Sequence, residues 1–308
     1  MPMRAKALFV LSLALAAASG AGAADLRVER MELLTHGSVD EDTGDFEASS
    51  RLYFDLAIAG GDKFGGVLKL DFLSGDIESD LAADEDLAAT ATLPEAIAKL
   101  NSLTSPRFRT AAITAKSVFE LPVDFSYFIG YMDAFASGDD FVPLFGAAPF
   151  ATSLRGPMVY PEGVGGDQNR FYDGIHAVNG TGFRVGTSPA LWEDFVGYAY
   201  FYQDSDLGTG RWSGDLRGLF NAPDVKLELF AGASTAADYG VYRGGILFFA
   251  APGEVGEFFL QVGIPYWDPS SALSVDNLYF LFEPRINFGF GAVALTVFYH
   301  PGWYRQRA

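Results

Sequence analysis

Apolar and polar residues alternate with a period of two along several segments of the chain. The alternation is clearest from Leu52 to Phe72, over 212–220 and 225–229, and most extended over 277–290. Successive side chains of a β-strand point to opposite faces of a sheet, so each segment predicts a strand with one apolar and one charged face. Large aromatic residues recur on the apolar face, which is unusual for a soluble β-sandwich.

Shorter or weaker patterns predict further strands, which bring the total to about thirteen. Long connections are expected over 35–49, 74–106 and 135–173, with tight turns between them. This alternation of long loops and short turns is typical of outer-membrane barrels. The predicted fold class is an all-β, transmembrane, antiparallel up-and-down β-barrel of about 12–14 strands. The further strands are expected at Leu26–Leu34, Phe108–Phe119, Phe125–Ala134, Gly174–Val185, Phe195–Tyr202, Tyr239–Ala250, Glu257–Ile264 and Ala292–Tyr299.

The N-terminus has the features of a secretory signal peptide. Arg4 and Lys6 precede an apolar run from Ala7 to Ala18, and small residues follow up to residue 24. The apolar run is shorter than the roughly 20 residues that a transmembrane helix needs. We therefore predict that residues 1–24 are removed on export to the bacterial outer membrane, and that 25–308 form the barrel domain.

Composition excludes several classes of protein. The chain has no cysteine, which rules out disulfides and thiolate metal sites. It holds 39 acidic against 21 basic residues, so it lacks the basic surface that nucleic-acid binding requires. The chain holds 28 Phe and 14 Tyr, as a membrane protein can, but after residue 24 it has no apolar run of about 18 residues that would predict a transmembrane helix. In lipid, a closed β-barrel is then the structure that satisfies the hydrogen bonds of the backbone.

The predicted strand count raises a question of parity. Single-chain bacterial barrels normally have an even number of strands, and thirteen would end the chain outside the cell. The tail over 300–308 also departs from the aromatic ending of most such barrels. Either a strand is missing from the count, with 153–160 as the candidate, or the sequence stops before the barrel closes.

The polar faces of the predicted strands supply candidate pore-lining residues, and the longest loop supplies candidates for a constriction. A long loop in a compact protein is usually functional or disordered, and mixed charges folded into a lumen would narrow it. If the loop stays outside, it is an exposed loop only. The pore-lining candidates are Arg51, Asp55, Lys69, Asp71, Asp215, Arg217, Lys226, Glu228, Glu283 and Arg285. The constriction-loop candidates are Asp139, Asp140, Arg155, Glu162, Asp167, Arg170 and Asp173.

Two acidic stretches admit more than one interpretation. The stretch over 75–103 combines acids with a helical pattern, which fits either a cap over the barrel mouth or a solvated surface loop. The stretch over 40–45 alternates acids with a glycine as calcium loops do, but the bidentate acid of an EF-hand is wrongly spaced. A plain acidic turn is the simpler interpretation.

No enzyme chemistry is predicted. His36, His176 and His300 show no metal-ligand spacing. The segment over 176–180 resembles the His, Asn and Gly of outer-membrane phospholipases, but Val178 stands where that family has its nucleophilic serine. The sequence therefore predicts no catalytic residue, no cofactor and no metal site.

The run Asn169–Gly174, which enters a strand after a long Gly/Pro loop, resembles the strand re-entry of porin-like outer-membrane proteins. Together with the strand pattern over about 25–300, the resemblance implies a barrel fold but no particular transporter. A channel for small solutes with weak or no selectivity is the favoured function. A structural or adhesive barrel with a filled lumen and a lipid-modifying enzyme are the alternatives. The expected partners are outer-membrane lipid and small solutes, without nucleic acid; the oligomeric state is left open.

Overall fold

The computed structural model describes residues 25–39, 46–74, 104–152, 174–207, 211–235, 240–253, 255–288 and 290–301. The predicted signal peptide and the candidate strand over 153–160 lie outside them. Within these residues no helix is both long and apolar enough to cross a bilayer. The chain divides into two compact units, Met1–Ile113 and Thr114–Ala308, which we call the first and second units.

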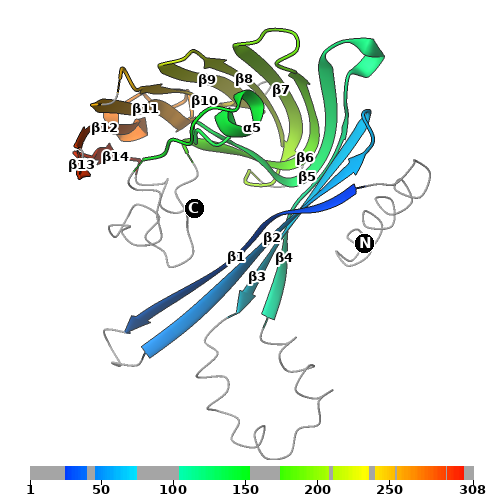
Figure 1. Ribbon diagram of the computed structural model, residues 1–308, viewed down its shortest axis with the longest axis horizontal. Coiled ribbons are helices and arrows are strands. Elements are labelled where there is room, and N and C mark those ends of the chain that lie inside the picture. The colour runs from blue at the N-terminus through cyan, green and yellow to red at the C-terminus, as the bar shows by residue number, and fades with distance from the viewer. Residues whose placement is uncertain are drawn as a thin grey trace, which may run out of the picture. The chain divides into compact units, whose positions relative to one another are not determined.

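The described residues form an all-β fold of fourteen antiparallel strands, which confirms the predicted up-and-down class (Figure 1). In the first unit β1 pairs with β2 and β2 with β3, and in the second unit each strand from β5 to β12 pairs with the next along the chain. The strands are β1 (Asp25–Val39), β2 (Phe46–Gly60), β3 (Phe64–Ser74), β4 (Thr104–Ala115), β5 (Val123–Phe135), β6 (His176–Thr187), β7 (Phe195–Asp204), β8 (Trp212–Asn221), β9 (Val225–Ser234), β10 (Val241–Ala250), β11 (Gly256–Trp267), β12 (Tyr279–Phe288), β13 (Gly291–Ala294) and β14 (Val297–Tyr299).

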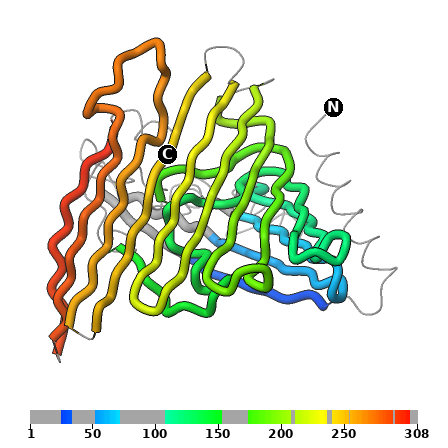
Figure 2. Tube along the Cα trace, turned by 90° about the horizontal axis from the view of Figure 1, so that it is seen from above, coloured from blue at the N-terminus to red at the C-terminus, as the bar shows by residue number. Residues whose placement is uncertain are grey.

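The helices among the described residues are short and lie in the connections. They are the 3-10 turns η1 (Val118–Glu120) and η2 (Val275–Asn277) and the α-helix α5 (Phe141–Phe145). In the second unit the strands from β5 to β12 lie side by side as one curved meander, as the tube trace makes clear (Figure 2). The longest connection within this meander, counted in residues, runs from the end of β5 at Phe135 to the start of β6 at His176.

Several strand ends differ from the sequence-based prediction. The connection expected over 35–49 is shorter, because β1 continues to Val39 and β2 begins at Phe46. The strand expected to reach residue 119 ends at Ala115. Beyond it Ser117 and Phe119 have φ values of 50° and 57°. This left-handed backbone cannot continue a strand, and it forms a turn that leads into β5.

The last predicted strand, over 292–299, is broken in two. The pieces β13 and β14 both pair with β12, at Arg285–Phe288 and at Phe280–Phe282 respectively. Pro284 lies between the two paired stretches, and its carbonyl accepts a hydrogen bond from Leu295 N–H at 3.1 Å. In an antiparallel strand the N–H and C=O of one residue point the same way. Proline has no N–H to return the bond, so the ladder is interrupted there.

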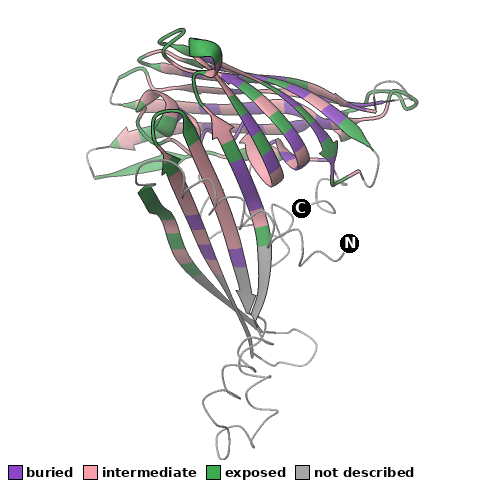
Figure 3. Ribbon diagram, turned by 90° about the vertical axis from the view of Figure 1, so that its right-hand side faces the viewer, coloured by how far each residue is buried: buried purple, intermediate pink, exposed green. Residues whose placement is uncertain are grey.

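Buried and more exposed residues alternate along strands of the second unit's sheet, so the two faces of the sheet differ in burial (Figure 3). On β8, Ser213, Asp215 and Arg217 are buried, whereas Leu216 and Phe220 are 64% and 42% exposed. We call the face that carries the buried polar residues the inward face and the other the outward face. Burial follows the alternation read from the sequence, but the charged residues are the covered ones, the reverse of the usual soluble pattern.

Aromatic residues collect near both ends of the outward face. Phe201 and Trp212 stack with ring centroids 4.9 Å apart, close to where β7 ends and β8 begins. At the opposite end of the same strands, Phe195 of β7 is the register partner of Phe220 of β8, and Trp192 precedes them in the turn. Exposed leucine lies between the two aromatic clusters.

Candidate functional site

Residues 136–152, which we call the inner segment, follow β5 and lie within the curve of the second unit's sheet (Figure 1). The segment is held from its first residue. The Ala136 N–H donates to Glu228 Oε1 at 2.6 Å, and the Ala136 carbonyl accepts from Gln261 Nε2. Glu228 belongs to β9 and Gln261 to β11, so side chains of the inward face replace the ladder bonds that the backbone loses on leaving β5.

Aromatic packing anchors the middle of the inner segment. Phe141, the first residue of α5, is fully buried, and its ring lies 5.4 Å from that of Phe150. Phe150 in turn stacks on Phe249 of β10, with ring centroids 4.4 Å apart. Gly138 has a φ of +86°, and an added Cβ would lie 2.9 Å from the Phe150 ring. The segment therefore turns at a position where glycine is required by both conformation and space.

A cluster of charged side chains connects the inner segment to the inward face of the sheet. Arg217 of β8 donates to Glu228 Oε1 at 2.7 Å and to Asp140 Oδ2 at 2.5 Å. The side chains of Arg217 and Glu228 are 0% exposed, whereas Asp140 keeps 31% exposure. The Arg217 guanidinium also lies 5.1 Å from the centre of the Phe135 ring. Buried charges of this kind persist only when they are paired and hydrogen-bonded.

The end of the described inner segment is fixed by a second cluster. Arg285 of β12 donates to Glu283 at 2.8 Å, to Glu257 at 2.9 Å and to the Ala151 carbonyl at 3.0 Å. Thr152 donates its hydroxyl to Glu283 at 2.9 Å. The segment is thus held at both ends by charged residues of β8, β9 and β12 and by the amide of Gln261 on β11.

The inward face carries two further clusters of charged and aromatic side chains. Arg243 of β10 makes a bidentate pair with Asp215 of β8 at 2.6 and 2.7 Å, and Tyr202 donates to the same carboxylate at 2.8 Å. His176 Nε2 lies 3.8 Å from Asp215 Oδ2. The His176 ring lies edge-on to Phe135, with centroids 5.4 Å apart.

The other cluster lies on β5, β6 and β7. Arg184 and Tyr200 both donate to Asp133 Oδ2, at 2.9 and 2.7 Å. Arg184 also contacts Ser126 at 3.3 Å and lies over the Tyr198 ring at 5.1 Å. The arginines of these clusters on the inward face are therefore all engaged in ion pairs.

The structure brings together five of the predicted pore-lining residues on this face: Asp215, Arg217, Glu228, Glu283 and Arg285. Each is engaged in an ion pair. Lys226 differs, since its ammonium donates to the carbonyls of Ala222 and Pro223 at the β8–β9 turn.

In the first unit, considered by itself, Asp55 of β2 lies opposite Lys69 of β3, and Asp71 lies opposite Tyr53. Asp55 and Asp71 are both buried. The structure describes only the backbone of Arg51, which pairs with Leu34 and Leu73.

Two of the constriction-loop candidates belong to the described residues. Asp140 pairs with Arg217, as above, while its neighbour Asp139 is exposed. The remaining candidates, for which the prediction stays untested, are Arg155, Glu162, Asp167, Arg170 and Asp173, all outside the described residues.

Sequence reasoning missed Asp133, Arg184, Arg243, Glu257 and Gln261, although all lie within or beside predicted strands. The available signal was the period of two: Arg243 is separated by even steps from the buried Val241 and Leu247. The partners of these five residues lie on other strands or in the inner segment, so the sequence alone could not predict them. No cluster of His, Cys, Asp and Glu able to hold a metal occurs among the described residues.

Comparison with known proteins gives structural likeness without sequence likeness. No protein-family model matches the chain, and no curated protein sequence matches it. Among solved structures, a porin of Rh. blastica carrying five substitutions aligns with 14% identity and a TM-score of 0.46, covering 91% of this chain and 86% of the porin. A triple mutant of the Rhodopseudomonas blastica porin aligns with 15% identity, the same coverage and the same TM-score.

Proposed function

We propose that the chain is an outer-membrane channel that passes small solutes with weak selectivity, and that the inner segment narrows its passage. The observation that carries this proposal is the pairing of an exposed apolar outward face with a charged inward face on the same strands. Such a sheet needs lipid on one side and polar surroundings on the other.

The dimensions of the outward face support a membrane location. On β8 the distance from Trp212 to Phe220 is about 27 Å of strand at about 3.4 Å per residue. A strand tilted by about 40° would cover about 20 Å of membrane thickness over that stretch. Exposed Leu216 lies between these aromatic residues and Leu229 lies on the adjacent strand. An apolar band flanked by aromatic girdles is what a barrel presents to lipid.

The inward face supports weak rather than strong selectivity. Arg184 and Arg243 each have a carboxylate partner, while Arg217 and Arg285 each have two. Paired charges largely cancel at a distance, and the excess of carboxylates leaves a modest negative potential. A modest preference for cations follows from this arrangement.

The test is conductance of the full chain in planar bilayers. Asp140→Asn removes the ion pair with Arg217, which is one anchor of the inner segment. A partly exposed ion pair contributes up to about 1 kcal/mol to holding the segment in place. We therefore expect the conductance or the current noise to rise about two-fold. Asp224→Asn makes the same charge change at an exposed position in the turn between β8 and β9, away from the inner segment, and serves as the control. Equal effects of the two variants would contradict a narrowing role for the inner segment.

A structural barrel with a filled interior is the second candidate. It is favoured by one observation: the side chains of Arg217 and Glu228 are 0% exposed beneath the inner segment. This candidate predicts insertion into vesicles with no conductance from either the parent protein or Asp140→Asn. Conductance of the parent protein decides for the channel.

A further inference from the structure

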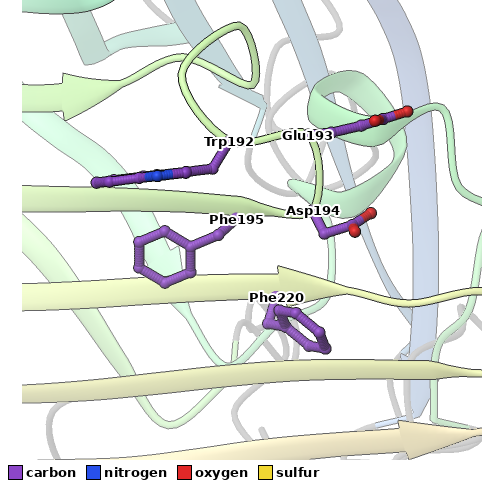
Figure 4. Close-up of a pocket in the computed structure, with 5 residues that line it drawn as sticks. All are labelled: Trp192, Glu193, Asp194, Phe195 and Phe220. Carbon is purple, nitrogen blue, oxygen red and sulfur yellow. The ribbon is translucent and has the colours of Figure 1, made fainter.

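The turn between β6 and β7 and the adjacent end of β8 form a hollow with two chemically different sides. It is lined by Trp192, Glu193, Asp194, Phe195 and Phe220 (Figure 4). The Trp192 and Phe195 side chains point one way along the strands, while the carboxylates of Glu193 and Asp194 point the other (Figure 4). The inner segment and the ion pairs of the inward face do not contribute to this hollow.

The apolar side of the hollow is held in place by the sheet beneath it. Gly197 of β7 and Gly218 of β8 are register partners. A Cβ added to Gly197 would lie 3.4 Å from the Phe195 ring, and one added to Gly218 would lie 3.2 Å from it. The ring therefore covers a cross-strand pair of glycines, an arrangement that positions an aromatic side chain on a sheet. Trp192 meets Phe195 edge-on, with centroids 5.7 Å apart.

The other side of the hollow is negatively charged. Glu193 and Asp194 are the charged residues of the turn over 188–194, and both are exposed. The next turn, over 222–224, adds Asp224. Lys226 lies near that turn, but its ammonium is bonded to the carbonyls of Ala222 and Pro223. A molecule seated on the rings would place its polar end beside carboxylates.

We propose that this hollow binds a phospholipid whose headgroup carries an ammonium group, with its acyl chain against Trp192, Phe195 and Phe220 and its ammonium beside Glu193 and Asp194. The inference rests on the proposed membrane location. Aromatic rings favour the boundary between lipid tails and headgroups, and they also attract cations. The carboxylates favour an ammonium headgroup over an anionic one by direct charge attraction.

The test uses the full chain in vesicles of phosphatidylethanolamine and phosphatidylglycerol, with either lipid carrying brominated acyl chains that quench tryptophan fluorescence. In a background with Trp212, Trp267 and Trp303 replaced by Phe, Trp192 is the sole reporter. We expect brominated phosphatidylethanolamine to quench Trp192 about two- to five-fold more effectively than brominated phosphatidylglycerol, the range for exposed charge pairs. High salt should reduce the difference.

Two variants make the result specific. Glu193→Gln combined with Asp194→Asn should bring the two lipids to parity at Trp192 and leave conductance unchanged. A matched reporter that retains only Trp212, beside Arg211 at the other aromatic cluster, should show no preference for the ammonium lipid. Equal quenching by both lipids in the parent reporter, which means non-specific surrounding lipid only, overturns the inference. Absence of quenching at both tryptophans overturns the membrane location itself and the inference with it.

Discussion

Neighbouring residues of β8 illustrate the two faces of the sheet. Arg217 points inward, is fully buried and has two carboxylate partners, whereas Leu216 points outward and is 64% exposed. In a soluble sheet the leucine would be covered and the arginine hydrated. The burial of these two residues is therefore the reverse of that in a soluble sheet. The inward face needs charged partners for its buried charges, and the outward face needs an apolar medium around it.

The inward face should be the more sensitive to loss of a single group. Arg217→Ala leaves Glu228 buried without its cation, and we expect the free energy of unfolding to fall by about 3–5 kcal/mol. Urea titration of the protein in vesicles, followed by tryptophan fluorescence, measures this change. Combining Arg217→Met with Glu228→Gln removes the unpaired charge, keeps an acceptor for the Ala136 N–H and should recover most of the loss. A loss below about 1 kcal/mol in Arg217→Ala would show that the pair is hydrated.

The outward face should be sensitive to charge only where it meets lipid. Leu216→Arg is expected to cost about 2–4 kcal/mol, the penalty for arginine near the middle of a bilayer. Leu273, which is 53% exposed in the connection between β11 and β12, provides the matched control. Leu273→Arg should change stability by less than about 0.5 kcal/mol. Equal tolerance at the two sites in the same urea titration would place the outward face in water.

The turn of the inner segment should show the smallest effect. Gly138→Ala combines a left-handed backbone with a Cβ 2.9 Å from Phe150, so we expect a loss of about 1–3 kcal/mol. Gly146 has a φ of +64° with open space around its Cβ position, and Gly146→Ala should cost only about 1 kcal/mol. Single-channel recording then shows whether displacement of Phe150 raises conductance. An unchanged Gly138→Ala channel of parent stability would contradict this account of the turn.

Much of the architecture was predictable because strand alternation is a local property. The alternating residues of 212–220 and 225–229 assigned both strands and both faces before any partner was known, and β8 and β9 bear this out. The break between β13 and β14 was not predictable from the residues of 292–299. Its cause lies in Pro284 on the neighbouring strand, which cannot donate a ladder hydrogen bond.

The candidate site divides in the same way. The sequence by itself determined which side chains share a face, since that depends only on the period of two along a strand. Only the tertiary structure decided which partner each charged group meets: Asp140 for Arg217, the Ala136 N–H for Glu228, and the Ala151 carbonyl for Arg285. These partners lie far apart in the chain. Their pairing arises because a charge withdrawn from water must find a partner in space, and sheet curvature and the inner segment decide which one is within reach.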